Sequence, residues 1–295
     1  MKKIALATLL AASAAIASAQ VTVSGKIGEY MDRTKTGSTT VNSLTAEPTS
    51  SIKFTATEAL GKGLTARVII DTKILANDPT KTDSQIGDRQ TTVGLANALG
   101  SIDLGRNYHS VFNTVAANDA FGAFYGTIAK DIHTVRDTRF SNGVFVSATP
   151  FANGKATYER SNGNVGGDAT AYSFGGKLGM ITATVARYEL GAEVSTVLAA
   201  GTTLGSTQVN AIYSDNSGVS NFKGTTVSAV HALTGTPLSL KGSYGQRTGD
   251  IKAFNMGVDY AFSKNTVASV IYRSVNAPAT SADINQVGVG LLMKF

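Results

Sequence analysis

The sequence contains no cysteine and only 5 prolines. Without cysteine the chain forms no disulfide bridge and carries out no thiolate chemistry. Beyond its amino-terminal segment it also lacks an apolar run of about 18 residues, which excludes a membrane-spanning helix. The remaining options for a stable chain of this length are a soluble fold or a membrane structure made of strands.

The amino-terminal segment has the pattern of a secretory signal peptide. Lys2 and Lys3 precede an apolar stretch, and the small residues Ala17-Ser18-Ala19 end it. This segment is too short and wrongly flanked to be a spanning helix. We therefore expect residues 1–19 to be a signal peptide and residues 20–295 to be the mature, exported domain. An exported chain without disulfides can be stabilised by closure of a large sheet, because a closed sheet has no free edges.

The net charge is modest and scattered. Loss of Lys2 and Lys3 leaves 24 basic residues against 20 acidic ones, so the net charge falls from +6 to +4. No stripe of clustered lysine and arginine is present, and the sequence gives no reason to expect nucleic-acid binding. The 31 glycines and few prolines suit either a secreted β-protein or a membrane barrel.

The dominant pattern is an alternation of apolar and polar residues in segments of about ten, as in membrane β-barrels. The apolar residues of one clear segment are Phe254, Met256, Val258, Tyr260 and Phe262. Counting such segments predicts sixteen strands, an even number, as bacterial single-chain barrels favour. The predicted strands are 20–32, 49–59, 64–73, 87–97, 100–108, 138–149, 154–161, 169–178, 180–190, 193–200, 206–214, 224–233, 237–247, 252–262, 265–275 and 284–295.

The connections and aromatic residues fit the same architecture. Short turns alternate with longer loops, such as residues 34–48, which we expect to be a loop, and both termini fall on the side of the short turns. Aromatic residues occur near the ends of segments, where the aromatic girdles of a barrel would lie. These residues are Tyr30, Phe140, Tyr158, Tyr188, Tyr213, Phe262, Tyr272 and Phe295.

The longest connection runs from Tyr108 to Thr138 and has no period of its own. Loops this long are uncommon in compact domains and are usually functional. Between two strands of a wide barrel the free space is inside. We therefore expect this loop to fold into the lumen.

Catalytic and metal-binding patterns are missing from the sequence. His109, His133 and His231 lie far apart and form no paired-ligand spacing. No G-x-S-x-G motif occurs, and Gly61-Lys62-Gly63 lacks the residues of a phosphate-binding loop. We expect no enzyme activity, no metal and no cofactor.

Basic residues recur in the polar phase of the strands, which should face the lumen. They are Lys26, Lys53, Arg67, Arg89, Arg139, Lys241, Arg247 and Arg273, and the long loop contributes Asp119 and Asp131. In a narrow water-filled neck, bases on one wall and acids on the other would produce a transverse field that favours ions of one sign. Alternatively, some of these residues are solvated lumen charges without consequence.

Several segments in order resemble the general porins of the Gram-negative outer membrane. They are RQTTVGL, GSIDLGRNYHSVFNT, AFG, RFSNG, the TEALGKGLTA hairpin and the terminal Phe295. The resemblance implies an outer-membrane channel for passive diffusion of ions and small hydrophilic solutes, with its third loop folded into the barrel. It also implies a homotrimer surrounded by outer-membrane lipid and a terminal aromatic, Phe295, that the barrel-insertion machinery reads.

The resemblance also indicates which residues line the constriction. Lys26, Arg89 and Arg139 stand where the family places wall cations, whereas the second-strand arginine position falls on Ser51, with Lys53 two residues on. Some members have proline and glutamate before Phe-Gly in the loop, where this chain has Asp119-Ala120, so the loop acid is shifted or weaker.

The predicted constriction set is Lys26, Lys53, Arg67, Arg89, Asp119 and Arg139. Arg136 is a second choice, and Arg106 is interpreted as structural, at a subunit contact.

Three other interpretations remain open. A substrate-specific channel would need a binding track, such as aromatics along one wall, and the sequence shows none. A barrel enzyme would need serine, histidine and an acid or amide close together near one rim. A soluble secreted β-protein would alternate as well, but it would favour large side chains on facing sheets.

The signal-peptide assignment predicts where the mature protein begins. Sequencing the amino terminus of membrane-derived protein should give Gln20 as the first residue. Recovery of Met1 in that material would contradict cleavage.

Overall fold

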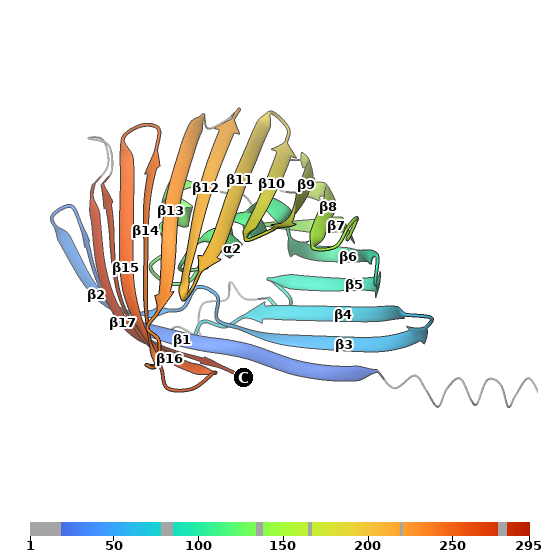
Figure 1. The fold of residues 1–295 in the computed structure, drawn as a ribbon, viewed down its shortest axis with the longest axis horizontal. Helices are drawn as coiled ribbons and strands as arrows, with labels where there is room; N and C mark the ends of the chain where they lie inside the picture. The colour runs from blue at the N-terminus through green and yellow to red at the C-terminus, as the bar shows by residue number, and fades with distance from the viewer. Residues whose placement is uncertain (1–18, 78–84, 134–137, 165–166, 219–220, 277–281) are drawn as a thin grey trace, which may run out of the picture.

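The computed structural model describes residues 19–77, 85–133, 138–164, 167–218, 221–276 and 282–295. Strands dominate, and each pairs antiparallel with its neighbours (Figure 1). The early elements are β1 (Gln20–Thr36), β2 (Thr39–Ala46), β3 (Ser51–Gly61), β4 (Leu64–Lys73), β5 (Gln90–Asn97), β6 (Gly100–Tyr108), α2 (Ser110–Asn118), α3 (Ala129–Ile132) and β7 (Arg139–Ala148). The later strands are β8 (Gly154–Asn164), β9 (Gly167–Leu178), β10 (Ile181–Leu190), β11 (Glu193–Leu204), β12 (Thr207–Ser217), β13 (Phe222–Ala232), β14 (Leu238–Arg247), β15 (Ile251–Ala261), β16 (Thr266–Asn276) and β17 (Ile284–Lys294).

The sheet closes on itself as a barrel of sixteen positions. β1 pairs with β17 from Lys26 opposite Lys294 to Thr36 opposite Ile284. β2 and β3 pair with successive halves of β1, so these two segments together fill one barrel position. The sixteen-strand antiparallel barrel predicted from the sequence is therefore confirmed.

One predicted loop is wrong. Residues 34–48 were expected to connect two strands, but most of them extend β1 and form β2, which turn back at Gly37 with a positive φ of 58°. Nearly all of β2 is exposed on both faces. Because neither face is buried, no alternation marks this strand, which is instead stabilised by its pairing with β1.

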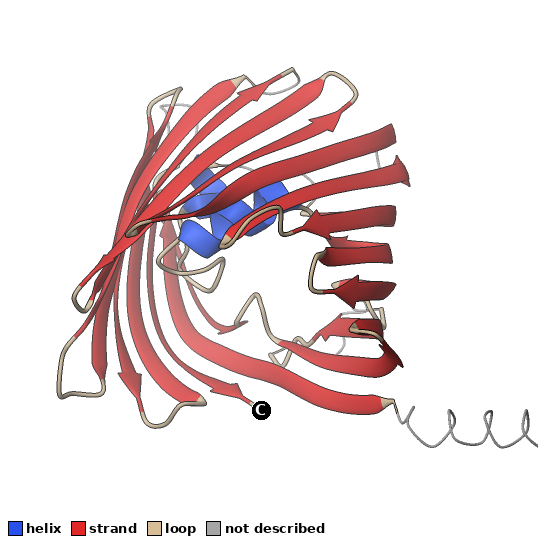
Figure 2. Cartoon of the chain, turned by 45° about the vertical axis from the view of Figure 1, so that its right-hand side comes forward, coloured by secondary structure: helices blue, strands red, loops and turns tan. Residues whose placement is uncertain are grey.

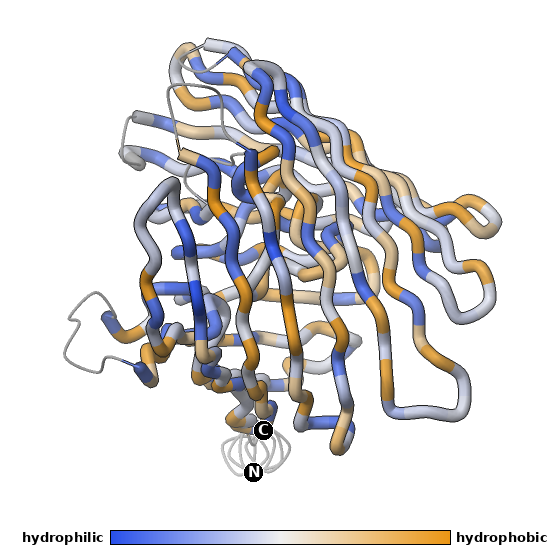
Figure 3. The backbone as a smooth tube through the Cα atoms, turned by 90° about the vertical axis from the view of Figure 1, so that its left-hand side faces the viewer, coloured by the Kyte–Doolittle hydropathy of each residue, from blue (hydrophilic) through white to orange (hydrophobic). Residues whose placement is uncertain are grey.

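Apolar and polar residues alternate along the strands (Figure 3), and the exposed fractions place the apolar ones on the outside of the barrel. On β15 the outward Phe254, Met256 and Val258 are 37%, 55% and 41% exposed, whereas the inward Ala253 and Asn255 are buried. A continuous apolar outer surface of this kind matches the lipid-facing band of membrane barrels. Among the described residues no helix has the length and apolar character needed to cross a membrane.

Three of the predicted girdle aromatics point inward. Tyr30, Phe140 and Tyr188 are each buried to 3% exposure or less and pack inside the barrel. Their sequence positions near strand ends are compatible with either face. They face inward because the lumen holds protein that must be packed against.

That protein is the connection between β6 and β7, whose two helices lie inside the ring of strands (Figure 2). Counting connections on the side of the longer loops, it is the third. α2 packs on the inner faces of β9 to β12, and α3 packs on β13, β14 and β15. The connection that was expected to fold into the lumen therefore lies along the inner wall of the barrel from β9 to β15.

The carboxy terminus completes the closure. The backbone of Phe295 exchanges two hydrogen bonds with Gly25 of β1, at 3.0 Å and 2.8 Å. A side chain at residue 25 would overlap the Phe295 ring, since an added Cβ would lie 2.5 Å from Cζ. The last residue is therefore part of the seam between the first and last strands.

Candidate functional site

α2 begins where His109 caps it and packs its apolar face on a wall of small residues. The imidazole of His109 accepts the backbone N–H of Phe112 at 3.3 Å and contacts the rings of Phe140 and Tyr188, at centroid distances of 5.0 and 5.1 Å. The apolar face of α2 packs against the barrel wall in a core cluster rich in alanine. The cluster comprises Val111, Val115, Ala129, Phe140, Phe145, Ala169, Ala171, Ala186, Tyr188, Leu190, Val197, Ala199 and Ile212.

These inward alanines were missed in the sequence, although a signal was present. Ala169, Ala171, Ala186 and Ala199 stand in the phase that faces the lumen, where a water-filled channel would carry polar side chains. A local run of small apolar residues in that phase indicates that the wall is covered by protein. It also leaves room for a helix to approach closely.

The loop tip is fastened to β1 and to the break between β2 and β3. The Tyr125 ring stacks on Tyr30 with centroids 4.0 Å apart, and its hydroxyl donates to the carboxylate of Asp32. The Tyr125 backbone N–H donates to Glu47 Oε2 at 2.9 Å. Asn255 of β15 donates to the next carbonyl, that of Gly126, at 2.8 Å.

The far end of the loop is fixed by His133 and Asp131. His133 is fully buried, with Nδ1 2.9 Å from Ser214 Oγ and Nε2 2.7 Å from Thr226 Oγ1. Burial lowers the pKa of His133 to about 4, so the ring is neutral at ordinary pH. Asp131 forms an ion pair with Arg273, with 2.6 Å between Oδ2 and Nη2.

Three of the predicted lumen charges therefore hold the loop. Arg273 pairs with Asp131, and Arg247 donates to the Asp131 carbonyl at 3.3 Å. Lys241 pairs with Asp259 at 2.9 Å and lies 4.7 Å from the centroid of the Phe121 ring. These side chains belong to the wall that the loop covers.

Cations on the opposite wall converge on the uncovered side of the loop. The Tyr108 hydroxyl accepts hydrogen bonds from Arg89 at 3.1 Å and from Arg139 at 2.5 Å. The Arg139 guanidinium also lies over the Tyr108 ring, 4.2 Å from its centroid. Lys26 Nζ sits 4.1 Å above the ring of Phe124 at the loop tip. The structure thus brings Lys26, Arg89 and Arg139 to one region.

Lys53 belongs to the same wall, but Arg67 does not act as a free charge. Lys53 of β3 pairs with Ser24 of β1, two residues before Lys26, and with Asp71 of β4. Arg67 reaches across Gly94 to Asp103, with Nε 2.8 Å from Oδ1. A side chain at residue 94 would block this ion pair, because its Cβ would lie 2.2 Å from Asp103 Oδ1.

The structure places Asp119 away from the cationic wall. Its side chain is 7% exposed, and its Oδ2 accepts hydrogen bonds from Thr127 Oγ1 at 2.5 Å and from the Ala123 N–H at 3.3 Å. Burial raises the pKa of this carboxyl group. Asp119 closes the turn that follows α2 instead of facing Lys26, Arg89 and Arg139, which differs from the sequence prediction.

The loop surface that remains uncovered is uncharged from Phe112 to Phe124. On α2 the face turned away from the wall carries Asn113, Ala116 and Ala117. Within the described loop residues 109–133 the only acids are Asp119 and Asp131, and both are engaged as described above. Arg136 lies outside the described residues.

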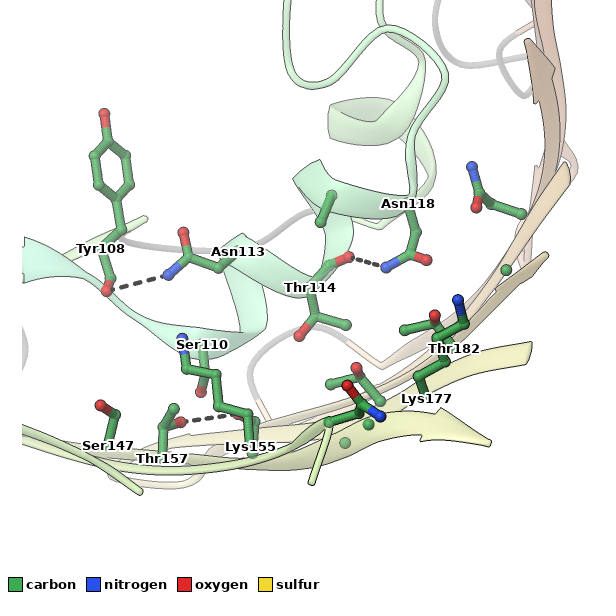
Figure 4. Close-up of a pocket in the computed structure, with 18 of the residues that line it drawn as sticks. Tyr108, Ser110, Asn113, Thr114, Asn118, Ser147, Lys155, Thr157, Lys177 and Thr182 are labelled. Carbon is green, nitrogen blue, oxygen red and sulfur yellow. Dashed lines mark hydrogen bonds between the residues drawn. The ribbon is translucent and has the colours of Figure 1, made fainter. Parts of the chain in front are cut away.

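Below α2 the lumen opens into a polar cavity of about 960 Å³ (Figure 4). Hydroxyl and amide side chains form most of its lining, including Ser110, Thr114, Asn118, Thr157 and Thr182, and Arg67 and Asp103 lie in its wall. Figure 4 shows Lys155 and Lys177 rising from the strands toward the helix. This cavity lies closer to the short turns than the cationic wall does.

Among the described residues, no group of three or more His, Asp or Glu side chains could hold a metal ion. His231, on β13, bonds Thr207 through Nδ1 at 2.8 Å near the rim. His109 and His133 are both committed to holding the loop.

Comparison with known proteins gives one family and several related structures. The family model described as Gram-negative porin matches residues 5–280. The anion-selective porin from Comamonas acidovorans superposes with a TM-score of 0.79 at 16% identity, covering 94% of this chain and 100% of that one. Salmonella typhi OmpF in complex with daunomycin gives 0.78 at 17% identity, with 93% and 97% covered. The trimer form of OmpT, an outer membrane protein of Vibrio cholerae, gives 0.72 at 11% identity, with 94% and 100% covered. No curated protein sequence matches.

The buried His133 makes attachment of the loop sensitive to acid. Its folded pKa of about 4 lies below the ordinary value of 6.5, so the native state binds fewer protons between these values. Stability from this residue is therefore complete above pH 6.5 and declines as the pH falls toward 4, by about 3 kcal/mol in total. Thermal unfolding of the barrel, followed by its gel mobility at pH 7 and pH 4, measures this loss.

A His133→Gln variant should be less stable than wild type at pH 7 but lose less between pH 7 and pH 4. His231→Gln, at the rim, should retain the wild-type difference between the two pH values. An equal pH dependence in wild type and His133→Gln would show that His133 does not carry the effect.

Proposed function

The chain belongs to the Gram-negative porin family and forms an outer-membrane channel for passive diffusion, and we propose that its constriction favours anions among the ions and small hydrophilic solutes that pass. The observation that carries this proposal is the one-sided charge of the neck. Lys26, Lys53, Arg89 and Arg139 stand on one wall, while the loop from Phe112 to Phe124 has no exposed charged residue.

The local charge count supports the sign. Two carboxylates, those of Glu47 and Asp71, lie close enough to Lys26 to interact with its charge, and so does a further cation, Lys294. Asp32, also inward on β1, is bonded to Tyr125 and Gln286. The four wall cations outnumber the two carboxylates beside Lys26. In a pore about 10 Å wide these charges lie within one Debye length of each other at physiological salt, so their fields overlap across the lumen. Counter-ions of negative sign accumulate in such a field.

The proposal reverses the expected role of the loop. A loop acid facing the wall would produce a transverse field and offset part of the wall charge. Asp119 is turned into the loop, and Asp131 pairs with Arg273 at the covered wall. The wall charge is thus opposed only by the acids on its own side. The similar barrel of Comamonas acidovorans is titled an anion-selective porin, which agrees with this sign.

Two alternatives receive less support from the site. A substrate-specific channel would require a continuous binding track, but the inward aromatics Tyr30, Phe140 and Tyr188 are buried against the loop. A barrel enzyme would require an assembled catalytic group, and the histidines that the structure describes are occupied as stated above. We propose that the protein acts as a channel without catalysis.

We further propose that the mature protein begins at Gln20, that it assembles as a homotrimer in outer-membrane lipid, and that Phe295 is the signal for the barrel-insertion machinery. The OmpT structure with a similar fold is titled a trimer form. The position of Phe295 at the seam of β1 and β17 supports a role in closing the barrel.

Arg106, interpreted above as structural, donates its Nε to the Asp88 carbonyl at 2.7 Å.

The charge proposal is tested by removing two wall cations. Arg89→Ala with Arg139→Ala leaves two cations against two carboxylates, so the ratio of anion to cation permeability should fall to about one. Conductance in concentrated salt should rise because the neck widens. Zero-current potentials in a salt gradient across a planar bilayer measure the first effect, and single-channel currents measure the second.

Arg33→Ala serves as the control, since Arg33 is exposed near the mouth. It should keep the wild-type potential and conductance. If the double variant matches this control, the constriction lies elsewhere and the assignment of Arg89 and Arg139 is wrong.

The assembly proposal is tested by deleting Phe295. The wild type should appear in the outer membrane as a heat-modifiable species with the mass of three chains. The deletion removes the two backbone hydrogen bonds to Gly25 and should lower the yield of this species without reducing export to the periplasm. Phe262→Ala, an exposed aromatic at the same rim, is the control. Wild-type insertion kinetics after the deletion would argue against a signal at Phe295.

A further inference from the structure

The second barrel position is interrupted at residues 47–50, between β2 and β3. Glu47 and Ser50 are fully buried there, at 1% and 0% exposure. The Glu47 N–H donates to the Gly28 carbonyl at 2.8 Å, and the Gly28 N–H donates to Ser50 Oγ at 3.1 Å. The break is therefore bonded to β1 on both sides, and the wall stays closed while the chain leaves strand geometry.

Because the backbone departs from strand geometry here, the Glu47 side chain can reach the inward loop. Its Oε2 accepts the Tyr125 N–H at 2.9 Å, and its Oε1 accepts the N–H and the hydroxyl of Thr49 at 3.1 and 3.0 Å. An added Cβ at Gly28 would lie 2.9 Å from Glu47 Cβ, so the missing side chain there gives the glutamate its room. The carboxylate is thus oriented from its own turn and bound to the loop tip.

The next residue of the break holds a wall cation. The Pro48 carbonyl accepts a hydrogen bond from Arg89 Nη2. Arg89 is 5% exposed, and its Nε has no partner among the described residues. One short turn is therefore bonded to the tip of the loop on one side and to the guanidinium of the cationic wall on the other.

We infer that Glu47 is a positioning residue that sets the gap between the loop tip and the cationic wall, and so the aperture of the channel. That this gap is the constriction rests on the function proposed above. Phe124, which lies under the Lys26 ammonium, directly precedes Tyr125. Any displacement of the Tyr125 backbone from Glu47 therefore moves the aromatic ring that faces the wall.

Other contacts keep the loop inside the barrel when the Glu47 contact is lost. The Tyr125 hydroxyl bonds Asp32, Asn255 bonds the Gly126 carbonyl, and His133 bonds Ser214 and Thr226. Loss of one net hydrogen bond would raise the population of a displaced tip about fivefold. The expected consequence is a fluctuating aperture in a barrel that still assembles.

Two conservative substitutions separate the reach of Glu47 from its charge. Glu47→Asp keeps the charge but is one methylene shorter, so its carboxylate no longer reaches the Tyr125 N–H. The open-channel current noise should rise about fivefold, in line with the displaced population, and the zero-current potential should stay unchanged. Glu47→Gln keeps the reach and an acceptor oxygen but loses the charge, so the current should stay quiet while the potential shifts further toward anions.

Matched controls come from Glu58 on β3, in the outward phase of the same barrel position. Glu58→Asp and Glu58→Gln should match wild type in noise and potential. A quiet Glu47→Asp channel, or a noisy Glu47→Gln channel, would overturn the inference, because a purely electrostatic residue gives that pattern. Thr49→Val removes the hydroxyl that orients the carboxylate, and it replaces Glu47→Asp if the latter does not assemble. Wild-type noise in Thr49→Val would then overturn the inference.

The two proposals fail separately. If removal of Arg89 and Arg139 leaves the potential unchanged, the charge assignment is wrong. The noise of Glu47→Asp reports motion of the loop tip in the lumen wherever the ions are selected.

Discussion

Closure of the hydrogen-bonded sheet is the constraint on which the rest of this structure depends. In a bilayer an unpaired strand edge leaves backbone N–H and C=O groups without partners, so the first and last strands must meet. β1 and β17 pair over eleven register positions, and Phe295 extends that seam to Gly25. The ring fixes which side of each strand faces lipid and which faces water, and it encloses a lumen too wide for its own side chains to fill.

The inward loop narrows that lumen, and its placement accounts for much of the chemistry inside the barrel. One half of the inner wall is given to holding the loop. Alanines accept α2, the buried His109 caps the start of α2, the buried His133 holds the loop after α3, and Arg273 pairs with Asp131. The other half carries Lys26, Lys53, Arg89 and Arg139, the cations that we propose set the charge preference of the passage. On that proposal the same residue type serves attachment on one wall and selectivity on the other, according to whether the loop covers it.

The break at 47–50 joins these two halves. Its Pro48 carbonyl accepts a hydrogen bond from Arg89 of the cationic wall, and its Glu47 carboxylate is bonded to the tip of the loop whose helices pack on β9 to β15. Residues 47–50 therefore hold both the loop tip and Arg89 in place. On the proposals above, the one carboxylate of Glu47 bears on both the charge of the neck and the position of the loop tip.

The alternation of residues was sufficient to predict the barrel, its sixteen positions and most strand limits, because a strand with one face in lipid and one in water must alternate. β2 was missed for the same reason, since it is exposed on both faces and has no alternation to read. The family resemblance placed Lys26, Arg89 and Arg139 in the neck, and the structure brings these three side chains together around Tyr108 and Phe124.

Only the tertiary structure decided what each charged or aromatic residue faces. Asp119 was expected to oppose the wall, but its carboxylate closes a turn through Thr127 and Ala123, a choice among local partners that spacing does not reveal. The charge of Arg67 is balanced by Asp103 two strands away, and Tyr188 faces inward because a helix from elsewhere in the chain lies there. The sequence by itself determined the wall of this protein, since strand periodicity is a local property. The contents of the lumen depend on contacts between residues far apart in the chain, so only the folded barrel determined them.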